Sequence, residues 1–323
     1  MMPRRLVLLV VLGLLSSAPA FAQAPTYINQ WGSYGTGDGQ LRYPQGIAVD
    51  AAGNVYIADH LNNRVQVFTR AGTSVTRWGS YGSGAGQFSG PAGVAVDADG
   101  RVYVADTYNH RIQVFRGDGT FVTQWGGSGA GSGQFARPMG VAVDRNGHVY
   151  VTDYLNHRVQ EFDTGGSFVT QWGGPGSGNG QFNCPLGVAV DAAGRVYVTD
   201  SQNHRIQVFN ENGGYLWQWG SYGTANGRFN VPAGVAVDGS GLIYVVDGGN
   251  DRVQVFKNFG GYLAQWGTGG TGIAQFDRPQ FLALDSSDDV LIADTRNHRV
   301  QTFGAVPVPT LATSWGRLKT LYH

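Results

Sequence analysis

Four histidines recur at one repeat position, and their chemistry is the first in this chain to suggest a metal site. They are His110, His157, His204 and His298, while Asn63 and Asp251 hold the same position in two other repeats. Zinc needs all of its ligands within about 2.0–2.3 Å of one ion. Equivalent positions of successive repeats lie far apart around a ring, so we expect ordinary loop histidines and no metal ligands.

A carboxylate and a guanidinium also recur together, in the pattern Asp-x-x-Asn-x-Arg. The aspartate can accept hydrogen bonds from loop amides, and the arginine can pair with it or with carbonyl groups of a neighbouring repeat. Residues present in every repeat mostly build the repeat, whereas an active site on a ring is usually asymmetric. We therefore predict no catalytic role, and a structural role, for Asp59, Arg64, Asp106, Arg111, Asp153, Arg158, Asp200, Arg205, Asp247, Arg252, Asp294 and Arg299.

Sequence signatures of common enzymes are missing from the chain. There is no His-Glu-x-x-His, Cys-x-x-Cys or Gly-x-Ser-x-Gly sequence, and no Gly-Lys-Ser/Thr loop that would cradle a phosphate. The many glycines are explained by turns that need positive φ, so they carry no nucleotide-binding signal.

Short strands are the elements that must position these residues. In the second repeat, apolar and β-branched runs at 91–97, 102–106, 111–115 and 121–125 are separated by Gly, Asp and Asn turns, which predicts four antiparallel strands. The first two runs are nearly all apolar, as expected for strands covered on both faces. Gln113, Thr123 and Gln124 place the third and fourth strands nearer to solvent.

Six tryptophans, each 47 residues after the last from Trp31 to Trp266, define the period. Such a period is typical of units that bury their faces against their neighbours. We predict an all-β, six-bladed β-propeller of four-stranded antiparallel blades, rather than a solenoid, because no capping repeat is visible. Residues 27–32 form a fourth strand that can complete the last blade and remove open edges. Residues 311–316 resemble the same strand two positions out of register, and they remain the alternative.

The first residues predict export. Arg4 and Arg5 precede an apolar run at 6–15 and a small-x-small site at 20–22, which indicates a signal peptide over 1–24. We expect a secreted or periplasmic monomer without a transmembrane segment, with the propeller over 25–304 and a short tail over 305–323 of open role. Cys184 is the only cysteine, so no internal disulfide can form. Removing the two arginines leaves 20 basic against 22 acidic residues, which argues against nucleic acid.

The repeated core resembles the NHL repeat. It reads Ala58-Asp59, then Asn62-Asn63-Arg64-Val65-Gln66-Val67-Phe68, and it recurs in six in-register copies between about residues 27 and 303. The preceding Gly-Gln-Phe and Pro-x-Gly-Val-Ala-Val-Asp segments are also similar to that family. The resemblance implies a six-bladed propeller. It leaves the activity open, since the family includes RNA-binding and protein-binding modules as well as a peptide-amidating lyase.

Positions that vary around the ring are the candidates for binding. The loops that lead into each blade and the loops between second and third strands emerge on one face. There the residues on either side of the first proline of each blade differ from repeat to repeat. We select Tyr43, Gln45, Arg137, Met139, Leu186, Arg278 and Gln280 as candidate ligand contacts, with neutral drift at exposed positions as the alternative interpretation.

Two functions follow from these observations. The first is an exported, non-catalytic propeller that binds a protein or a cell-envelope polymer through the loop face around the central channel, with no cofactor. The alternative is a metal-assisted lyase or lactonase of the six-bladed type. Enzymes of that type, as the resemblance implies, depend on carboxylates, histidines or arginines near the axis, where a divalent ion would sit. Here the innermost strands carry mostly Val, Ala and Gly.

Overall fold

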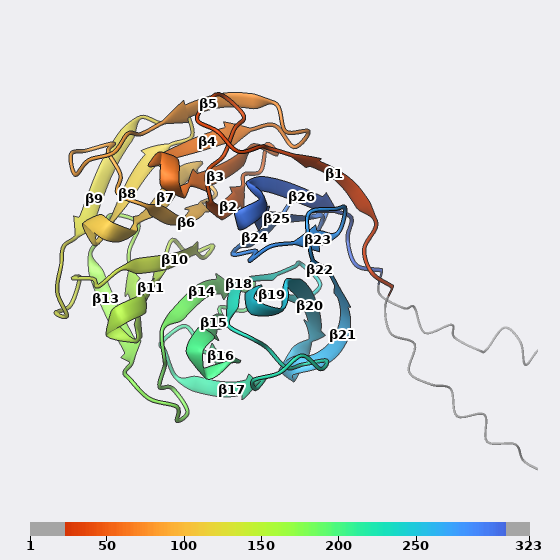
Figure 1. Cartoon of the computed structure of the whole chain (residues 1–323). Coiled ribbons are helices and arrows are strands. Elements are labelled where there is room, and N and C mark those ends of the chain that lie inside the picture. Colours follow the sequence, from red (N-terminus) through yellow and green to blue (C-terminus); the bar gives the residue numbers. More distant parts are fainter. Residues whose placement is uncertain (1–22, 308–323) are drawn as a thin grey trace, which may run out of the picture.

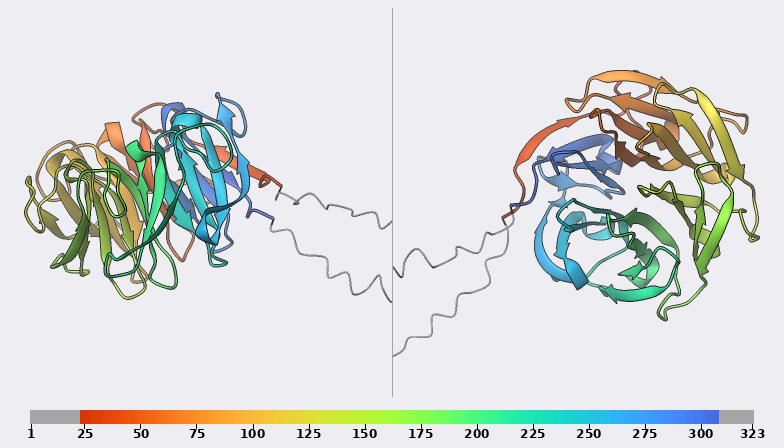
Figure 2. Two further views of the ribbon diagram at one scale, coloured as in Figure 1. Left: turned by 90° about the horizontal axis from the view of Figure 1, so that it is seen from below. Right: turned by 180° about the vertical axis from the view of Figure 1, so that it is seen from behind.

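The computed structural model describes residues 23–307, which form six four-stranded antiparallel sheets around a central axis (Figure 1). Seen from the side, the ring is a disc with loops on both faces (Figure 2). The predicted fold class and blade count are confirmed. Residues 1–22 of the predicted signal peptide and residues 308–323 of the predicted tail lie outside the described residues.

Each blade runs from an inner to an outer strand. Blade 1 has β2 (Pro44–Val49), β3 (Val55–Asp59), β4 (Arg64–Phe68) and β5 (Ser74–Trp78). Blade 2 has β6 (Pro91–Val96), β7 (Arg101–Asp106), β8 (Arg111–Arg116) and β9 (Phe121–Gly126). Blade 3 has β10 (Pro138–Val143), β11 (Val149–Asp153), β12 (Arg158–Phe162) and β13 (Phe168–Gly173).

The second half repeats the pattern. Blade 4 has β14 (Pro185–Val190), β15 (Val196–Asp200), β16 (Arg205–Phe209) and β17 (Tyr215–Trp219). Blade 5 has β18 (Pro232–Val237), β19 (Ile243–Asp247), β20 (Arg252–Lys257) and β21 (Gly261–Trp266). Blade 6 has β24 (Leu282–Leu284), β25 (Val290–Asp294), β26 (Arg299–Phe303) and β1 (Tyr27–Trp31). A short parallel pair, β22 (Thr268–Gly269) and β23 (Gln275–Phe276), joins blades 5 and 6.

One-turn 3-10 helices connect the second and third strands of every blade. They are η1 (His60–Asn62), η2 (Thr107–Asn109), η3 (Tyr154–Asn156), η4 (Ser201–Asn203), η5 (Gly248–Asn250) and η7 (Thr295–Asn297). A seventh, η6 (Asn258–Gly260), lies between β20 and β21. We call the side of the disc that carries η1–η5 and η7 the loop face. The opposite side, which carries the hairpin turns, is the turn face.

The N-terminal strand closes the ring. β1 pairs with β26, with Tyr27 opposite Phe303 and Trp31 opposite Val300, so the first and last parts of the chain share blade 6 (Figure 1). The backbone N–H of Gly304 also donates to the carbonyl of Thr26 (2.8 Å). Closure by residues 27–32 therefore agrees with the prediction, and the alternative segment 311–316 lies outside the described residues.

The expected exposure of the third strand is wrong. All five core residues of β8 are buried, and Gln113 is 0% exposed. Its Nε2 donates to Oδ2 of Asp106 (3.0 Å) and to the Gln87 carbonyl (2.6 Å), while its Oε1 accepts from the Gly86 N–H (2.9 Å). A fully satisfied amide can be buried, so this polar residue marks a bonding role and not a wet surface. Only the fourth strand alternates between exposed and half-buried residues.

Glycines allow the inner strands to approach one another closely. A Cβ at Gly93 would lie 2.3 Å from the carbonyl oxygen of Met139 in the next blade. The same contact, at 2.1–2.8 Å, would arise at Gly46, Gly140, Gly187 and Gly234. Any side chain there would push neighbouring blades apart, which explains the glycine of the Pro-x-Gly motif. Blade 6 is the exception, because Phe281 replaces this glycine.

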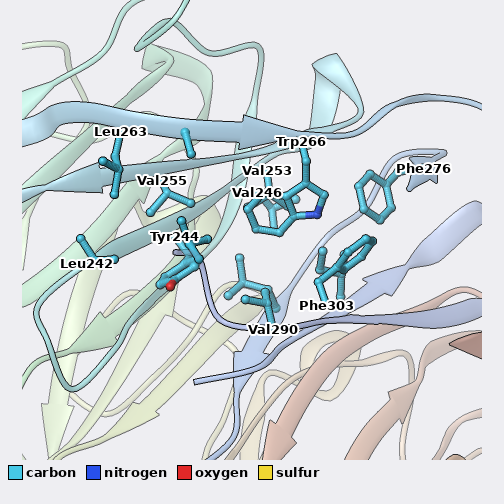
Figure 3. Close-up of a cluster of buried hydrophobic side chains, with 14 of the residues drawn as sticks. Leu242, Tyr244, Val246, Val253, Val255, Leu263, Trp266, Phe276, Val290 and Phe303 are labelled. Carbon is cyan, nitrogen blue, oxygen red and sulfur yellow. The ribbon is translucent and has the colours of Figure 1, made fainter. Parts of the chain in front are cut away.

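Apolar side chains fill the space between successive blades. Between blades 5 and 6, the rings of Trp266 and Phe276 both contact Phe303, at centroid distances of 5.7 and 6.0 Å (Figure 3). Tyr244 and Leu263 belong to the same cluster of buried residues. The indole N–H of each of the six periodic tryptophans has no hydrogen-bond partner within residues 23–307. These tryptophans therefore contribute through packing alone.

Candidate functional site

The repeated Asp–Arg pairs are buried beneath the loop face. Nε of Arg64 donates to Oδ2 of Asp59 (2.8 Å), and its remaining N–H groups donate to the carbonyls of Thr36, Gly37 and Gln40 at 2.7–2.9 Å. The other five pairs repeat this bond at 2.7–2.8 Å, namely Asp106–Arg111, Asp153–Arg158, Asp200–Arg205, Asp247–Arg252 and Asp294–Arg299. The arginine N–H groups already donate to the aspartate and to carbonyls of the loop that leads into the blade, so few of them are left for a ligand.

The repeat-position histidines tie each blade to the next one. Each His Nδ1 accepts the backbone N–H of the residue before the first proline of the next blade, and the distances are 3.0–3.2 Å. The donors are Tyr43 to His298, Arg137 to His110, Cys184 to His157 and Val231 to His204. Asn63 and Asp251 accept the equivalent bonds through Oδ1. An accepting Nδ1 must be unprotonated, and burial, together with nearby Arg42, lowers the pKa of His298.

These hydrogen bonds fix the backbone at the candidate positions. Tyr43, Arg137 and Arg278 are exposed and have φ of 55°, 59° and 49°. The backbone of non-glycine residues rarely adopts this left-handed conformation. The hydrogen bonds therefore fix the backbone at these three positions, and with it the direction in which each side chain leaves the loop. Gln45, Met139 and Gln280 are half-buried, whereas Leu186 is buried at 8% exposure beside Ala233. The seven residues are distributed over four blades and form no single cluster.

Exposed tyrosines on the loop face extend the candidate surface. The ring of Tyr34 is 61% exposed and lies 5.0 Å from His298, and the ring of Tyr43 contacts the same imidazole at 4.9 Å. Two arginines cover tyrosines: Arg42 lies 5.6 Å from the Tyr34 ring, and Arg137 lies 5.3 Å from the Tyr108 ring. Blades 6 and 1 to 3 thus carry an aromatic and cationic sector. We call Tyr34, Arg42, Tyr43, Tyr108 and Arg137 the tyrosine–arginine sector.

Sequence reasoning missed Tyr34, Tyr81 and Tyr222, which share one repeat position and are 61–75% exposed. Ser128, Pro175 and Gly269 hold that position in the other repeats. The sequence therefore contained a sign of this surface, because three repeats carry a tyrosine at a position where the other three carry a small residue or proline, next to Gly-rich loops.

The central channel has an aliphatic wall. It holds a cavity of about 280 Å³ lined by Ile, Val, Ala, Leu and Gly of the six inner strands, together with Phe281. No titratable side chain lines it. Within residues 23–307, no three His, Cys, Asp or Glu side chains are grouped as metal ligands. In the same part of the chain, no helix is long and apolar enough to cross a membrane.

The aspartates that end the inner strands belong to turns. Oδ1 of Asp50 accepts the backbone N–H groups of Ala52 and Asn54 (2.9 and 2.8 Å), and Oδ2 accepts the hydroxyl of Tyr56 (3.0 Å). Asp97, Asp191 and Asp238 make the same kind of contacts in their blades. This pattern is an Asx turn with a tyrosine lock.

Comparison with known proteins identifies the repeat. NHL repeats match residues 41–68, 88–115, 135–162, 182–209, 229–256 and 276–303. No curated protein matches the sequence.

Several solved structures have a similar fold. One is a protein of unknown function from Bacteroides thetaiotaomicron, with TM-score 0.68, 19% identity, and coverage of 88% of this chain and 83% of that one. Another is a gluconolactonase from Xanthomonas campestris (0.63, 17%, 88% and 98%). A third is a catalytically inactive virginiamycin B lyase from Staphylococcus aureus with quinupristin (0.57, 18%, 81% and 84%). At these identities the likeness shows the fold alone.

Proposed function

Because the chain belongs to the NHL-repeat family, we propose that it is an exported, non-catalytic propeller that holds a protein or a cell-envelope polymer on its loop face. The observation that carries this proposal is the tyrosine–arginine sector. Tyr and Arg are the side chains enriched at the centres of binding interfaces, and Tyr-, Ser- and Gly-rich loops are typical of adaptable binding surfaces. Here they stand on backbone positions fixed by hydrogen bonds between blades.

Rigid presentation supports binding because it lowers the entropy lost when a partner docks. Tyr43 and Arg137 need no rearrangement of the backbone, since their N–H groups are already bonded to His298 and His110. Arg278 is held in the same way by Asp251. Export is supported by the basic and apolar pattern of the first residues, which lie outside the described part of the chain.

The test compares the triple variant Tyr43→Ala, Arg137→Ala, Arg278→Ala with wild type in affinity capture from the native envelope and culture medium. Loss of several interface centres predicts at least about a tenfold drop in captured partner. The matched control is Arg116→Ala, Lys257→Ala, which removes two exposed cations from the turn face. Equal melting temperatures must show that all three proteins are folded. Unchanged capture by the triple variant, or equal loss by the control, would show that the assigned face is wrong.

A metal-assisted lyase or lactonase is the second candidate. Its fold has solved counterparts, but the aliphatic channel lining gives the binding function more support than an axial reaction centre. Thermal melting with and without EDTA separates the two, since an ion that binds the folded state raises its stability. A fall in the melting temperature after EDTA treatment would favour the enzyme.

A further inference from the structure

The turn face has a groove at the seam between blades 1 and 2, and the seam between blades 3 and 4 carries different side chains at the equivalent positions. Between blades 1 and 2 the groove has a volume of about 560 Å³. Its wall includes Asp50, Asn54, Tyr56 and Val67 of blade 1, and Gly117 and Asp118 of blade 2. Residues 94 positions later hold the equivalent places at the seam between blades 3 and 4.

Three neutral residues of the first groove are replaced by titratable ones at the second seam. His148 stands for Asn54, Glu161 for Val67 and Glu211 for Gly117. The Glu161 position is otherwise occupied by Val67, Val114, Val208, Val255 and Thr302. An isolated change is expected from drift. Three changes that meet across one seam, at residues far apart in the chain, point to a site.

Glu161 is a buried acid without a hydrogen-bond donor. It is 4% exposed, and Nδ1 of His148 lies 4.0 Å from its Oε1. That nitrogen is closer to Oδ2 of Asp144, at 3.0 Å. Burial raises the pKa of Glu161, and the charges of Asp144 and Glu211 raise it further, while His148 opposes them. Asp144 and Glu161 therefore lie beside one imidazole, and Glu211 is close enough to raise the pKa of Glu161.

A buried hydroxyl in the same place also lacks a partner. Tyr150 is 0% exposed, and its OH makes no hydrogen bond of normal geometry within the described residues, although Asp144 is near enough to influence it. Its counterparts Tyr56, Tyr103, Tyr197 and Tyr244 each donate to the aspartate of their own blade at 2.9–3.1 Å. A buried hydroxyl without a hydrogen bond is costly, so its presence near Glu161, which also lacks a donor, suggests that a missing donor completes the network.

Another seam shows which group fits there. Arg70 holds the position of Glu211 at the seam between blades 6 and 1, and its guanidinium pairs with Asp289 and, at 2.9 Å, with Asp285. The fold thus already places a guanidinium among carboxylates at an equivalent seam. Between blades 3 and 4 the carboxylates are present, but no described Lys or Arg pairs with Asp144, Glu161 or Glu211.

We propose that the side-chain cluster at the seam between blades 3 and 4 binds a guanidinium group, with Glu161, Asp144 and Glu211 as its charge partners and the Tyr150 hydroxyl as an additional acceptor. A planar guanidinium can donate to several carboxylate oxygens at once, which a point charge cannot do. The group can belong to a free small molecule or to an arginine side chain of a peptide. This site lies on the turn face and is separate from the loop-face function proposed above.

The experiment is isothermal titration of the full mature chain at low ionic strength with three probes: methylguanidine, N-acetyl-arginine methylamide and its neutral citrulline analogue. Both guanidinium probes are expected to bind and the citrulline analogue is not. Equal affinity of the two guanidinium probes would assign a free guanidinium compound, whereas much tighter binding of the arginine derivative would assign a peptide. No difference between the arginine and citrulline probes would overturn the proposal.

Two variants restore residues that the fold uses elsewhere. Glu161→Val and Glu211→Gly each restore one residue of the groove between blades 1 and 2, and each is expected to weaken guanidinium binding by at least about tenfold. The matched control is Asp118→Asn in the 1–2 groove, which should leave the affinity unchanged. Wild-type affinity in Glu161→Val would contradict the assignment. Stoichiometric binding of Zn²⁺ that excludes the guanidinium probe would reassign the cluster to a metal ion.

Discussion

Replacing Arg111 with alanine is expected to destabilise the propeller by about 4 kcal/mol, because removing one partner of a buried ion pair typically costs 3–5 kcal/mol. The guanidinium makes five hydrogen bonds, to Oδ2 of Asp106 (2.7 Å), to Oε1 of Gln124 (2.9 Å) and to three backbone carbonyls at 2.7–2.9 Å. Those carbonyls would lose their donors, and the carboxylate of Asp106, which is 0% exposed, would lose its counter-charge.

Urea and thermal unfolding measure this loss, and the repeats supply internal replicates. About 2 °C per kcal/mol applies to a domain of this size, so the melting temperature should fall by roughly 8 °C. Arg158→Ala and Arg205→Ala should give similar values, since both residues also make five such bonds. Arg64→Ala should give somewhat less, because Arg64 makes four. A loss below about 1 kcal/mol at all these sites would refute the structural role.

Three further changes test the frame. Val231 has φ of 51°, which disfavours a β-branched residue, so Val231→Asn should raise stability by about 1 kcal/mol in urea unfolding, and a decrease would refute the strain. Gly93→Ala should lower the melting temperature by several degrees, because the new Cβ would meet the Met139 carbonyl. The control Gly239→Ala should be nearly neutral, because its new Cβ would have no atom within 4 Å. Equal effects of the two changes would refute the close approach of the inner strands. Because folding lowers the pKa of His298, the unfolded chain binds more protons than the folded chain just below about pH 6.5. The contribution of His298 to the free energy of unfolding is therefore complete above that pH, and it is lost as the pH falls toward the folded-state pKa. Unfolding at several pH values should show less of this slope in His298→Asn, which keeps an acceptor as Asn63 does, and an unchanged slope would contradict the assignment.

The repeat made the frame predictable from sequence. Register, blade number and closure by residues 27–32 follow from a period without insertions, because each copy constrains the interpretation of the others. The polar third strand was misjudged because a glutamine in a sequence does not reveal whether its amide is satisfied. Gln113 reaches Asp106 on the neighbouring strand and the Gln87 carbonyl in a loop, and both contacts exist only after folding.

Sites that lie between blades were harder to predict. Glu161 and Glu211 are 50 residues apart and meet only across a seam, so no local motif joins them. Phe281 is a second example. It lines the channel at the position where the other five blades have the glycine of the Pro-x-Gly motif, and the sequence alone did not show that this position faces the channel. Comparing the six copies position by position reveals both exceptions, whereas the geometry of the ring is needed to show what they contact.

Site-specific photo-crosslinking in the native exported fraction tests the central claim most directly, namely that irregular loop-face positions bind the partner while repeated residues build the frame. A photoreactive amino acid replaces Tyr43 on the loop face or Asp118 on the turn face. Specific adducts from position 43 and none from position 118 are the predicted result. Adducts from position 118 alone, or none from position 43 while the partner is still captured, would contradict it.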